Sequence, residues 1–437
     1  MKIKKHILIV LTIITTFIGV LLYTNSSLAT DTESNFEISS DSAILIDSNT
    51  GKVLYGKNEN EKLYPASTTK ILTAILAIEK CNLKDKIQAS KSAVMSIPAG
   101  YSNAAIQPGE ALTVQDLLDL FLIHSANEVG YIFAEHISGS VENFATLMNQ
   151  KATELGCKNT HFTNPSGIHD PEHYSTAYDM ALIAKYCMKN ETFRSIVSKT
   201  SCTIEATDKY EKRYFKNTND LIIPSSEYYY ENAIGVKTGY TSQAKSCLIS
   251  ASLKDNFELI TVVLGAKPLE NRYVDTINLF EYGYSNYTIQ KIATKNSVID
   301  NIDVKNATKD TKNLDLILKD DIIALTPKDF LTDAIVTINQ DISAPISEGD
   351  VLGKITYNID GLTYSSDLIA SHSVEKFNVP LLIAQIVIAI FVLFILAKLF
   401  SPKKKSKNKK KKNGKSKSKK NKTKKYNNSL DSIYKFN

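Results

Sequence analysis

The chain has few of the residues that cross-link small exported domains or hold structural zinc. It contains five cysteines among 437 residues, and no two of them form a C-x-x-C pair. Disulfide frameworks and zinc sites both depend on cysteines at short, recurring spacings. The sequence therefore identifies neither, and buried free thiols are the expectation for Cys81, Cys157, Cys187, Cys202 and Cys247.

Polar residues are nearly absent from residues 379–400, where only Gln385 and Lys398 interrupt the sequence VPLLIAQIVIAIFVLFILAKLF. As a helix with a rise of about 1.5 Å per residue, this segment would be roughly 33 Å long, enough to cross a hydrocarbon core of about 30 Å. A buried helix of a soluble protein would show a polar face at this length. The segment is therefore predicted to span a membrane.

Acidic residues are nearly absent after that segment. Residues 401–437 contain 16 lysines and one acid, Asp431, whereas residues 30–378 contain 32 basic and 45 acidic residues, a net charge of −13. By the positive-inside rule, the tail is expected in the cytosol and the body outside the cell. A run of lysines can bind either nucleic acid or anionic lipid. Because a membrane segment lies next to this run, contact with anionic lipids is expected and a nucleic-acid partner is not.

The N-terminus has the features of an export signal. Lys2, Lys4 and Lys5 precede an apolar run over residues 7–22, and Ser27 and Ala29 fit a cleavage site. A signal peptide is predicted over residues 1–29. A retained signal anchor is the alternative, because the apolar run is long, and either one exports the body.

The body is expected to have an α+β fold. Residues 42–58 contain two apolar runs around Asn49-Thr50-Gly51, which predicts strand, turn and strand. Residues 113–155 and 175–190 have helical patterns, with Ser140 as an expected cap in the first and a start at Ser175 or Thr176 in the second, and three β-branched runs follow residue 234. One antiparallel sheet that joins both ends and is packed by helices explains this order. Residues 289–375 have short strands and no long helix, which predicts a second, all-β domain.

Three short motifs follow one another along the body: Ser67-Thr68-Thr69-Lys70, Ser125-Ala126-Asn127 and Lys237-Thr238-Gly239. Each alone has an ordinary explanation: Ser67 as a helix cap, the second as loop residues, and Lys237 as an exposed lysine near a turn. The alternative is that the three motifs form a catalytic site. Positions i and i+3 share a helix face, so Lys70 can reach the Ser67 hydroxyl. A lysine activates a serine only where burial or nearby cations keep it partly neutral.

The third motif adds a binding surface. Lys237 and Thr238 lie in a strand-like segment beside Gly239, where a missing side chain allows another backbone to come close. An extended peptide can pair with such an edge, which would place its terminal carboxylate near Lys237. His169 and His173 are less promising as metal ligands, because the intervening Asp170-Pro171 does not fit a regular helix. They are interpreted as structural.

The ordered set resembles that of the penicillin-binding proteins and serine β-lactamases. The sequence around these motifs resembles that of the low-molecular-mass D-alanyl-D-alanine carboxypeptidases over residues 36–285, including HSANEVGYIFAEHISGSVENFATLMN and GVKTGYTSQAKSCLISAS. ISEGDVLGKITYNIDG resembles the C-terminal β domain of that family. The resemblance implies a β-lactamase/transpeptidase-like domain, a small β domain and a membrane tether, and it implies no metal or organic cofactor.

The resemblance also implies roles. Ser67 would attack the penultimate D-alanine carbonyl of a peptidoglycan stem peptide, Lys70 would take its proton, Ser125 would relay a proton and Asn127 would hold the substrate backbone. Lys237, Thr238 and Gly239 would bind the peptide, and the backbone N–H groups of Ser67 and Tyr240 would form an oxyanion hole. β-Lactams would acylate the same serine. The chain departs from the family where Ala244-Lys245 replaces the usual Ala-Gly pair.

Two other functions share these motifs. A serine β-lactamase of the common class needs a dedicated glutamate to hydrolyse its acyl-enzyme, and no E-x-x-L-N sequence lies between Ser125 and Lys237. A non-catalytic β-lactam sensor or wall-binding protein would keep the pocket without turnover, and the intact Lys70 and Ser125 argue against it.

Overall fold

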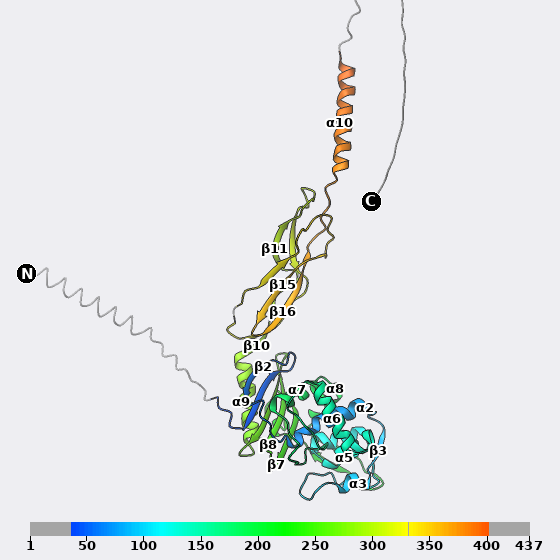
Figure 1. Cartoon of the computed structure of the whole chain (residues 1–437), viewed down its shortest axis with the longest axis vertical. Helices are drawn as coiled ribbons and strands as arrows, with labels where there is room; N and C mark the ends of the chain where they lie inside the picture. Colours follow the sequence, from blue (N-terminus) through cyan, green and yellow to red (C-terminus); the bar gives the residue numbers. More distant parts are fainter. Residues whose placement is uncertain (1–35, 331, 402–437) are drawn as a thin grey trace, which may run out of the picture.

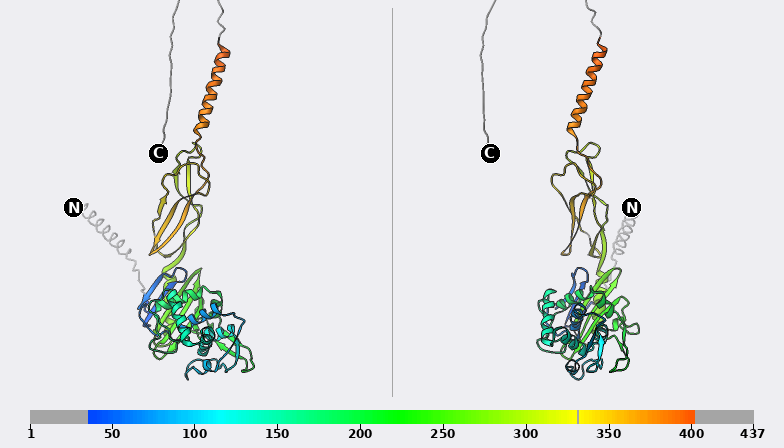
Figure 2. Two further views of the ribbon diagram at one scale, coloured as in Figure 1. Left: turned by 45° about the vertical axis from the view of Figure 1, so that its right-hand side comes forward. Right: turned by 90° about the vertical axis from the view of Figure 1, so that its right-hand side faces the viewer.

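The computed structural model describes residues 36–330 and 332–401. Figures 1 and 2 show a globular part of helices and strands, an elongated β part after it, and one helix that projects from the far end of the β part. The predicted signal peptide at residues 1–29 and all but Ser401 of the predicted tail at residues 401–437 lie outside the described residues, so both stay predictions.

The globular part is built on a five-stranded antiparallel sheet with the strand order β2-β1-β9-β8-β7. Strands β1 (Ser42–Asp47) and β2 (Val53–Lys57) come from the start of this part. Strands β7 (Ala233–Thr241), β8 (Lys245–Lys254) and β9 (Phe257–Ala266) come from its end. Pairing of β1 with β9 joins the two ends, which confirms the single sheet predicted from the sequence.

Helices cover both faces of this sheet. Successive side chains of a strand point to opposite faces; in β1, Ile44 and Ile46 pack in the larger core, whereas Ala43 and Leu45 pack in a second core with Phe280. Phe280 belongs to α9 (Asn271–Asn286), which lies on one side of the sheet in Figure 1, with α2, α5 and α6 on the other. The sheet is therefore the middle layer of three.

The chain between β2 and β7 forms the helical layer and two small hairpins. The predicted helix starts are confirmed where Ser140 accepts a hydrogen bond from the Asn143 N–H and Thr176 from the Asp179 N–H. The elements are η1 (Ala66–Thr69), α2 (Lys70–Lys80), β3 (Lys86–Gln88), α3 (Lys91–Met95), β4 (Ala111–Thr113), α4 (Val114–Asp119), η2 (Leu120–His124), α5 (Asn127–Ser138), α6 (Val141–Glu154), α7 (Ala177–Met188), α8 (Glu191–Val197), β5 (Ser201–Ile204), β6 (Arg213–Lys216) and η3 (Asp220–Ile222).

The β part has a core of its own, which includes Leu314, Leu316, Ile355 and Leu368. One sheet has the order β11-β12-β16-β15-β14, and β10 pairs with β13 beside it. The part follows α9 directly, and Lys52 forms an ion pair with Asp360 between the globular part and the β part. Its strands are β10 (Tyr287–Ala293), β11 (Val298–Asp303), β12 (Asn313–Leu318), β13 (Ile322–Pro327), β14 (Ile335–Ile338), β15 (Val351–Ile359) and β16 (Leu362–Ala370).

Helix α10 (Val379–Phe400) stands apart from both folded parts (Figures 1 and 2). Its 22 residues are long and apolar enough to cross a membrane, and none of them is buried within the protein. A helix this apolar on every face fits a membrane anchor better than a core helix.

Candidate active site

Ser67 lies in the 3₁₀ turn η1, immediately before helix α2. Its side chain makes no capping hydrogen bond, and Thr69, not Ser67, precedes the helix. The Ser67 Oγ instead accepts a hydrogen bond from Lys70 Nζ at 2.8 Å. The ordinary explanation of Ser67 as a helix cap is therefore wrong, and the serine and lysine contact each other as their spacing predicted.

Two glycines hold the Ser67 turn in place. A Cβ added to Gly239 of β7 would lie 3.0 Å from the Ser67 nitrogen, and one added to Gly167 would lie 1.8 Å from the Ala66 carbonyl oxygen. Gly167 also has a φ of +76°, which other residues rarely adopt. The close approach expected at Gly239 is therefore present, because β7 passes directly over the turn.

Lys70 is completely buried and has three hydrogen-bond acceptors around its amino group. Besides Ser67 Oγ, Nζ donates to Asn127 Oδ1 at 2.8 Å and to the Ser166 carbonyl oxygen at 2.7 Å. Burial, together with the nearby Lys237 charge, lowers the pKa of Lys70 well below its ordinary value of 10.5, although Glu128 acts in the opposite direction. A lysine with a lowered pKa gives up its proton more readily than an ordinary lysine, and once neutral its nitrogen donates only two hydrogen bonds and has a lone pair that can accept the Ser67 proton.

The second motif lies across the cleft from β7. Ser125 ends the single π-helical turn η2 with a left-handed φ of 69°, and Asn127 begins α5. Asn127 Oδ1 accepts from Lys70, while its Nδ2 donates to the Ser102 carbonyl oxygen at 2.8 Å. Both ends of this amide are thus engaged before any substrate binds, and the asparagine connects the lysine to the loop at Ser102.

The third motif lies on β7, an edge strand of the sheet. Thr238 Oγ1 is 2.6 Å from Thr218 Oγ1. Lys237 is only 1% exposed, and its Nζ donates to the Thr238 carbonyl oxygen at 3.1 Å. Burial, with Arg272 nearby, lowers the pKa of Lys237 to about 7. Lys237 therefore lies behind the cleft surface, whereas Thr238 faces the cleft.

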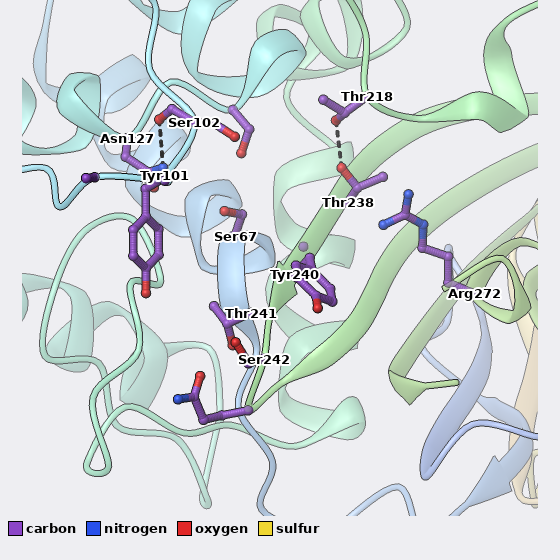
Figure 3. A pocket seen from close by; sticks show the side chains of 15 residues that line it. Ser67, Tyr101, Ser102, Asn127, Thr218, Thr238, Tyr240, Thr241, Ser242 and Arg272 are labelled. Atoms are coloured by element: carbon purple, nitrogen blue, oxygen red, sulfur yellow. Dashed lines mark hydrogen bonds between the residues drawn. The ribbon is translucent and has the colours of Figure 1, made fainter. Parts of the chain in front are cut away.

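Arg272 of α9 was missed by the sequence analysis. Its side chain points toward Thr238 across the end of the cleft (Figure 3). Nη2 donates to Tyr273 Oη at 2.9 Å, and Nε is buried without a hydrogen-bond partner among the described residues. The chain has three arginines, of which Arg194 and Arg213 pair with carboxylates. The rarity of arginine in this lysine-rich chain was the one available signal.

The histidines considered as metal ligands support the structure of the site. His173 is buried, its Nε2 lies 2.9 Å from Thr69 Oγ1, and its Nδ1 accepts from the Thr163 N–H at 3.1 Å. Burial lowers the pKa of His173 to about 3. The His169 ring packs edge-on against Tyr64. His173 thus supports the turn that carries Ser67, in keeping with its interpretation as a structural residue.

Ser67, Ser125, Asn127, Thr238 and Arg272 are among the residues that line a cleft of about 430 Å³ (Figure 3). Thr218, Thr238 and Arg272 lie at one end, Ser67 lies near the middle, and Thr241 and Ser242 lie toward the other end. A serine beside a lysine with a lowered pKa, next to an open strand edge, can attack a carbonyl of an extended peptide. The remaining lining residues are Ala99, Gly100, Tyr101, Ser102, Gly239, Tyr240 and Gln243.

Two family models match the chain in succession. The first, described as D-alanyl-D-alanine carboxypeptidase, matches residues 29–268. The second, described as Penicillin-binding protein 5, C-terminal domain, matches residues 287–376. The matches correspond to the globular part and the β part.

Known relatives extend over most of the chain. D-alanyl-D-alanine carboxypeptidase DacF of Bacillus subtilis is 38% identical over 339 residues, which cover 76% of this chain and 84% of the relative. Penicillin-binding protein 5 from Haemophilus influenzae has a similar structure, with a TM-score of 0.60, 29% identity, and coverage of 78% of this chain and 98% of the other. The S96A mutant of the Streptomyces K15 DD-transpeptidase matches with a TM-score of 0.54 and 31% identity, over 57% of this chain and 98% of the other.

Proposed function

Because the chain belongs to the D-alanyl-D-alanine carboxypeptidase family, we propose that it removes the terminal D-alanine from peptidoglycan stem peptides with Ser67 as the nucleophile. The observation that carries this proposal is the 2.8 Å contact between Ser67 Oγ and the buried Lys70 Nζ. Neither matched family model describes a β-lactamase, and the carboxypeptidase is therefore favoured over that alternative.

In the first half of the reaction, Ser67 Oγ bonds to the penultimate D-alanine carbonyl carbon while neutral Lys70 takes the hydroxyl proton. The peptide C–N bond then breaks, and the proton passes to the leaving D-alanine nitrogen, with Ser125 in the cleft as the relay. Water attacks the resulting ester by the reverse path and frees Ser67. A β-lactam carbonyl acylates the same oxygen, so the enzyme binds penicillin covalently.

The charge that develops on the carbonyl oxygen is stabilised by backbone N–H groups. We assign this role to the N–H groups of Ser67 and Tyr240. The β7 backbone at Gly239, next to Tyr240, passes close to the Ser67 nitrogen, so both N–H groups can lie near the same carbonyl oxygen. One such donor contributes about 2.7 to 4 kcal/mol to the transition state. Asn127 Nδ2 binds the substrate backbone after exchanging its bond to the Ser102 carbonyl.

The terminal carboxylate is assigned to Arg272 and Thr238, and the buried Lys237, whose Nζ donates to the Thr238 carbonyl oxygen, is assigned to holding this part of β7 in place. Arg272 lines the cleft, whereas Lys237 is 1% exposed. Guanidinium groups bind carboxylates through two parallel hydrogen bonds. Gly239 allows the peptide backbone to lie close to Ser67 when it pairs with the edge of β7.

The length and apolar composition of α10 support attachment of this activity to a membrane, and we assign the globular part to the outer side. The lysines that follow α10 would then lie in the cytosol and contact anionic lipids of the inner leaflet. The signal peptide at residues 1–29 would direct this export.

The test is Ser67→Ala, assayed for D-alanine release from diacetyl-Lys-D-Ala-D-Ala and for covalent labelling by penicillin. Both should be lost while the circular dichroism spectrum stays the same. The matched control is Ser242→Ala, since Ser242 and Lys245 form another S-x-x-K pair beside the same cleft. That variant should still be labelled; labelling of a folded Ser67→Ala protein would refute the assignment.

A further inference from the structure

A second cavity of about 420 Å³ lies at the end of the sheet where β1 begins, β9 ends and the β7–β8 hairpin turns. The proposed catalytic steps use none of its side chains. It adjoins the catalytic cleft, because Gln243 lines both. The other lining residues are Asp41, Lys62, Leu63, Tyr64, Pro171, Tyr174, Ala244, Lys245 and Gly265.

An ion pair and a neighbouring glycine form one wall of this cavity. Lys245 Nζ forms an ion pair with Asp41, and both side chains keep partial exposure, 26% and 41%. Gly265 makes room for the acid, since a Cβ there would lie 2.5 Å from Asp41 Oδ2. Lys245 has a φ of +60°, a left-handed conformation in which a glycine would be less strained. The chain thus keeps a lysine at a position whose backbone favours glycine.

The charges of the cavity favour an anion. Lys62 and Lys245 supply two positive charges against the one negative charge of Asp41. Lys62 Nζ lies 4.4 Å from the centre of the Tyr174 ring, and within residues 36–330 and 332–401 no carboxylate oxygen lies within 4 Å of it. The rings of Tyr64 and Tyr174, with Leu63 and Pro171, supply an apolar wall for the methylene groups of a ligand.

An extended substrate reaches this cavity. With its terminal carboxylate at Arg272, the acyl part of the peptide runs along β7 from Tyr240 toward Gln243. Three residues of strand span roughly 10 Å, at about 3.3 Å per residue. Groups two or three residues before the scissile bond therefore meet the cavity.

We propose that this cavity is a specificity subsite for a carboxylate on the acyl part of the substrate, two or three residues before the scissile bond, with Lys245 and Lys62 as its cationic contacts. The inference rests on the proposed function, because the direction of the peptide follows from Arg272 holding the terminal carboxylate. Asp41 positions Lys245 and lowers the preference for anions.

The test compares two peptides that end in D-Ala-D-Ala and differ only in one upstream group, a free carboxylate or its carboxamide. The measured quantity is the ratio of kcat/KM for the carboxylate peptide to that for the carboxamide peptide. This ratio cancels differences in the amount of active enzyme. For a partly exposed charge pair we expect a ratio of about two to five at low salt, falling as salt is raised.

Variants move this ratio in opposite directions. Lys245→Gly, which suits the left-handed backbone, should bring the ratio to about one or below, and Lys62→Gln should lower it. Asp41→Asn should raise it, because the competing negative charge is removed. Lys84→Gln, which removes an exposed lysine outside the two cavities, is the matched control and should leave the ratio unchanged.

A ratio near one in the unmodified enzyme, with normal D-alanine release from both peptides, would overturn the subsite and leave the proposed function standing. A ratio above one that is unaffected by both lysine variants would also overturn it. Failure to release D-alanine from either peptide would overturn both proposals.

Discussion

Replacing Arg272 with glutamine tests which cation holds the terminal carboxylate of the substrate. Glutamine keeps most of the side-chain length and hydrogen-bonding capacity but removes the charge. Arg272 lies on the cleft surface opposite Thr238, whereas Lys237 is buried, with its Nζ donating to the Thr238 carbonyl oxygen. Arg272→Gln should therefore weaken binding of the carboxylate directly.

The size of the effect follows from the burial of Arg272. A hydrogen bond to a charged group contributes about 1.5 to 3 kcal/mol. Arg272 is partly exposed, so solvent screening places the loss at the lower end, about 1.5 to 2 kcal/mol. This corresponds to a loss of roughly 10- to 30-fold in kcat/KM. A substrate with a terminal amide has no such charge and should lose little.

The assay measures kcat/KM for a D-Ala-D-Ala peptide and for its terminal amide, with the unmodified enzyme, Arg272→Gln and Lys237→Gln. Arg272→Gln should slow turnover of the acid far more than that of the amide, whereas Lys237→Gln should affect both about equally. If instead only Lys237→Gln slows turnover of the acid more than that of the amide, Arg272 does not hold the carboxylate. Lys237 would then be its binding residue, as the sequence motif predicted.

Three further outcomes follow from the structure. Lys70→Arg should lower acylation by penicillin nearly as much as Ser67→Ala, because arginine keeps the charge but does not accept a proton at neutral pH; rapid acylation of the arginine variant would contradict this. In the unmodified enzyme, the rate of acylation should fall as the pH drops through the lowered pKa of Lys70. The pKa of Lys237 is lowered to about 7, so between pH 7 and 10.5 the unfolded chain holds a proton that the folded chain has released, and this lysine makes the free energy of unfolding rise with pH by up to about 1.4 kcal/mol per pH unit. Lys237→Met should make that rise shallower in urea unfolding at pH 7, 8 and 9, and an unchanged slope would show that Lys237 is not buried as a neutral amine. Protease added to wall-stripped cells should release a fragment that ends near Lys376 and leave a tail epitope protected; loss of the epitope would reverse the proposed orientation.

The local parts of the fold and site could be predicted from the sequence. Ser67 and Lys70 are three residues apart, so one turn of helical backbone brings them together wherever that turn lies in the protein. The β-branched runs after residue 234 predicted the adjacent strands β7, β8 and β9 in the same local way. Helix starts at Ser140 and Thr176 followed from side chains that satisfy nearby backbone N–H groups.

The long-range parts could not be predicted in this way. Arg272 enters the cleft because α9 packs across the sheet, and no spacing relates it to Thr238. Nor does a short pattern show that Lys70 Nζ would meet the Ser166 carbonyl, 96 residues away. The π-helical turn before Ser125 was also missed, since its sequence, LFLIH, resembles any buried helix segment.

The position of β7 at the edge of the sheet also determines what cannot enter the site. An open strand edge ordinarily invites pairing with strands of other proteins. Here the edge lies inside a cleft whose opposite wall is formed by Tyr101, Ser102 and Asn127. A single extended chain is thin enough to lie beside β7, whereas the edge of a folded sheet carries neighbouring strands that would collide with this wall. The cleft therefore admits a single extended chain to β7 and excludes pairing of this edge with the sheet of another folded protein.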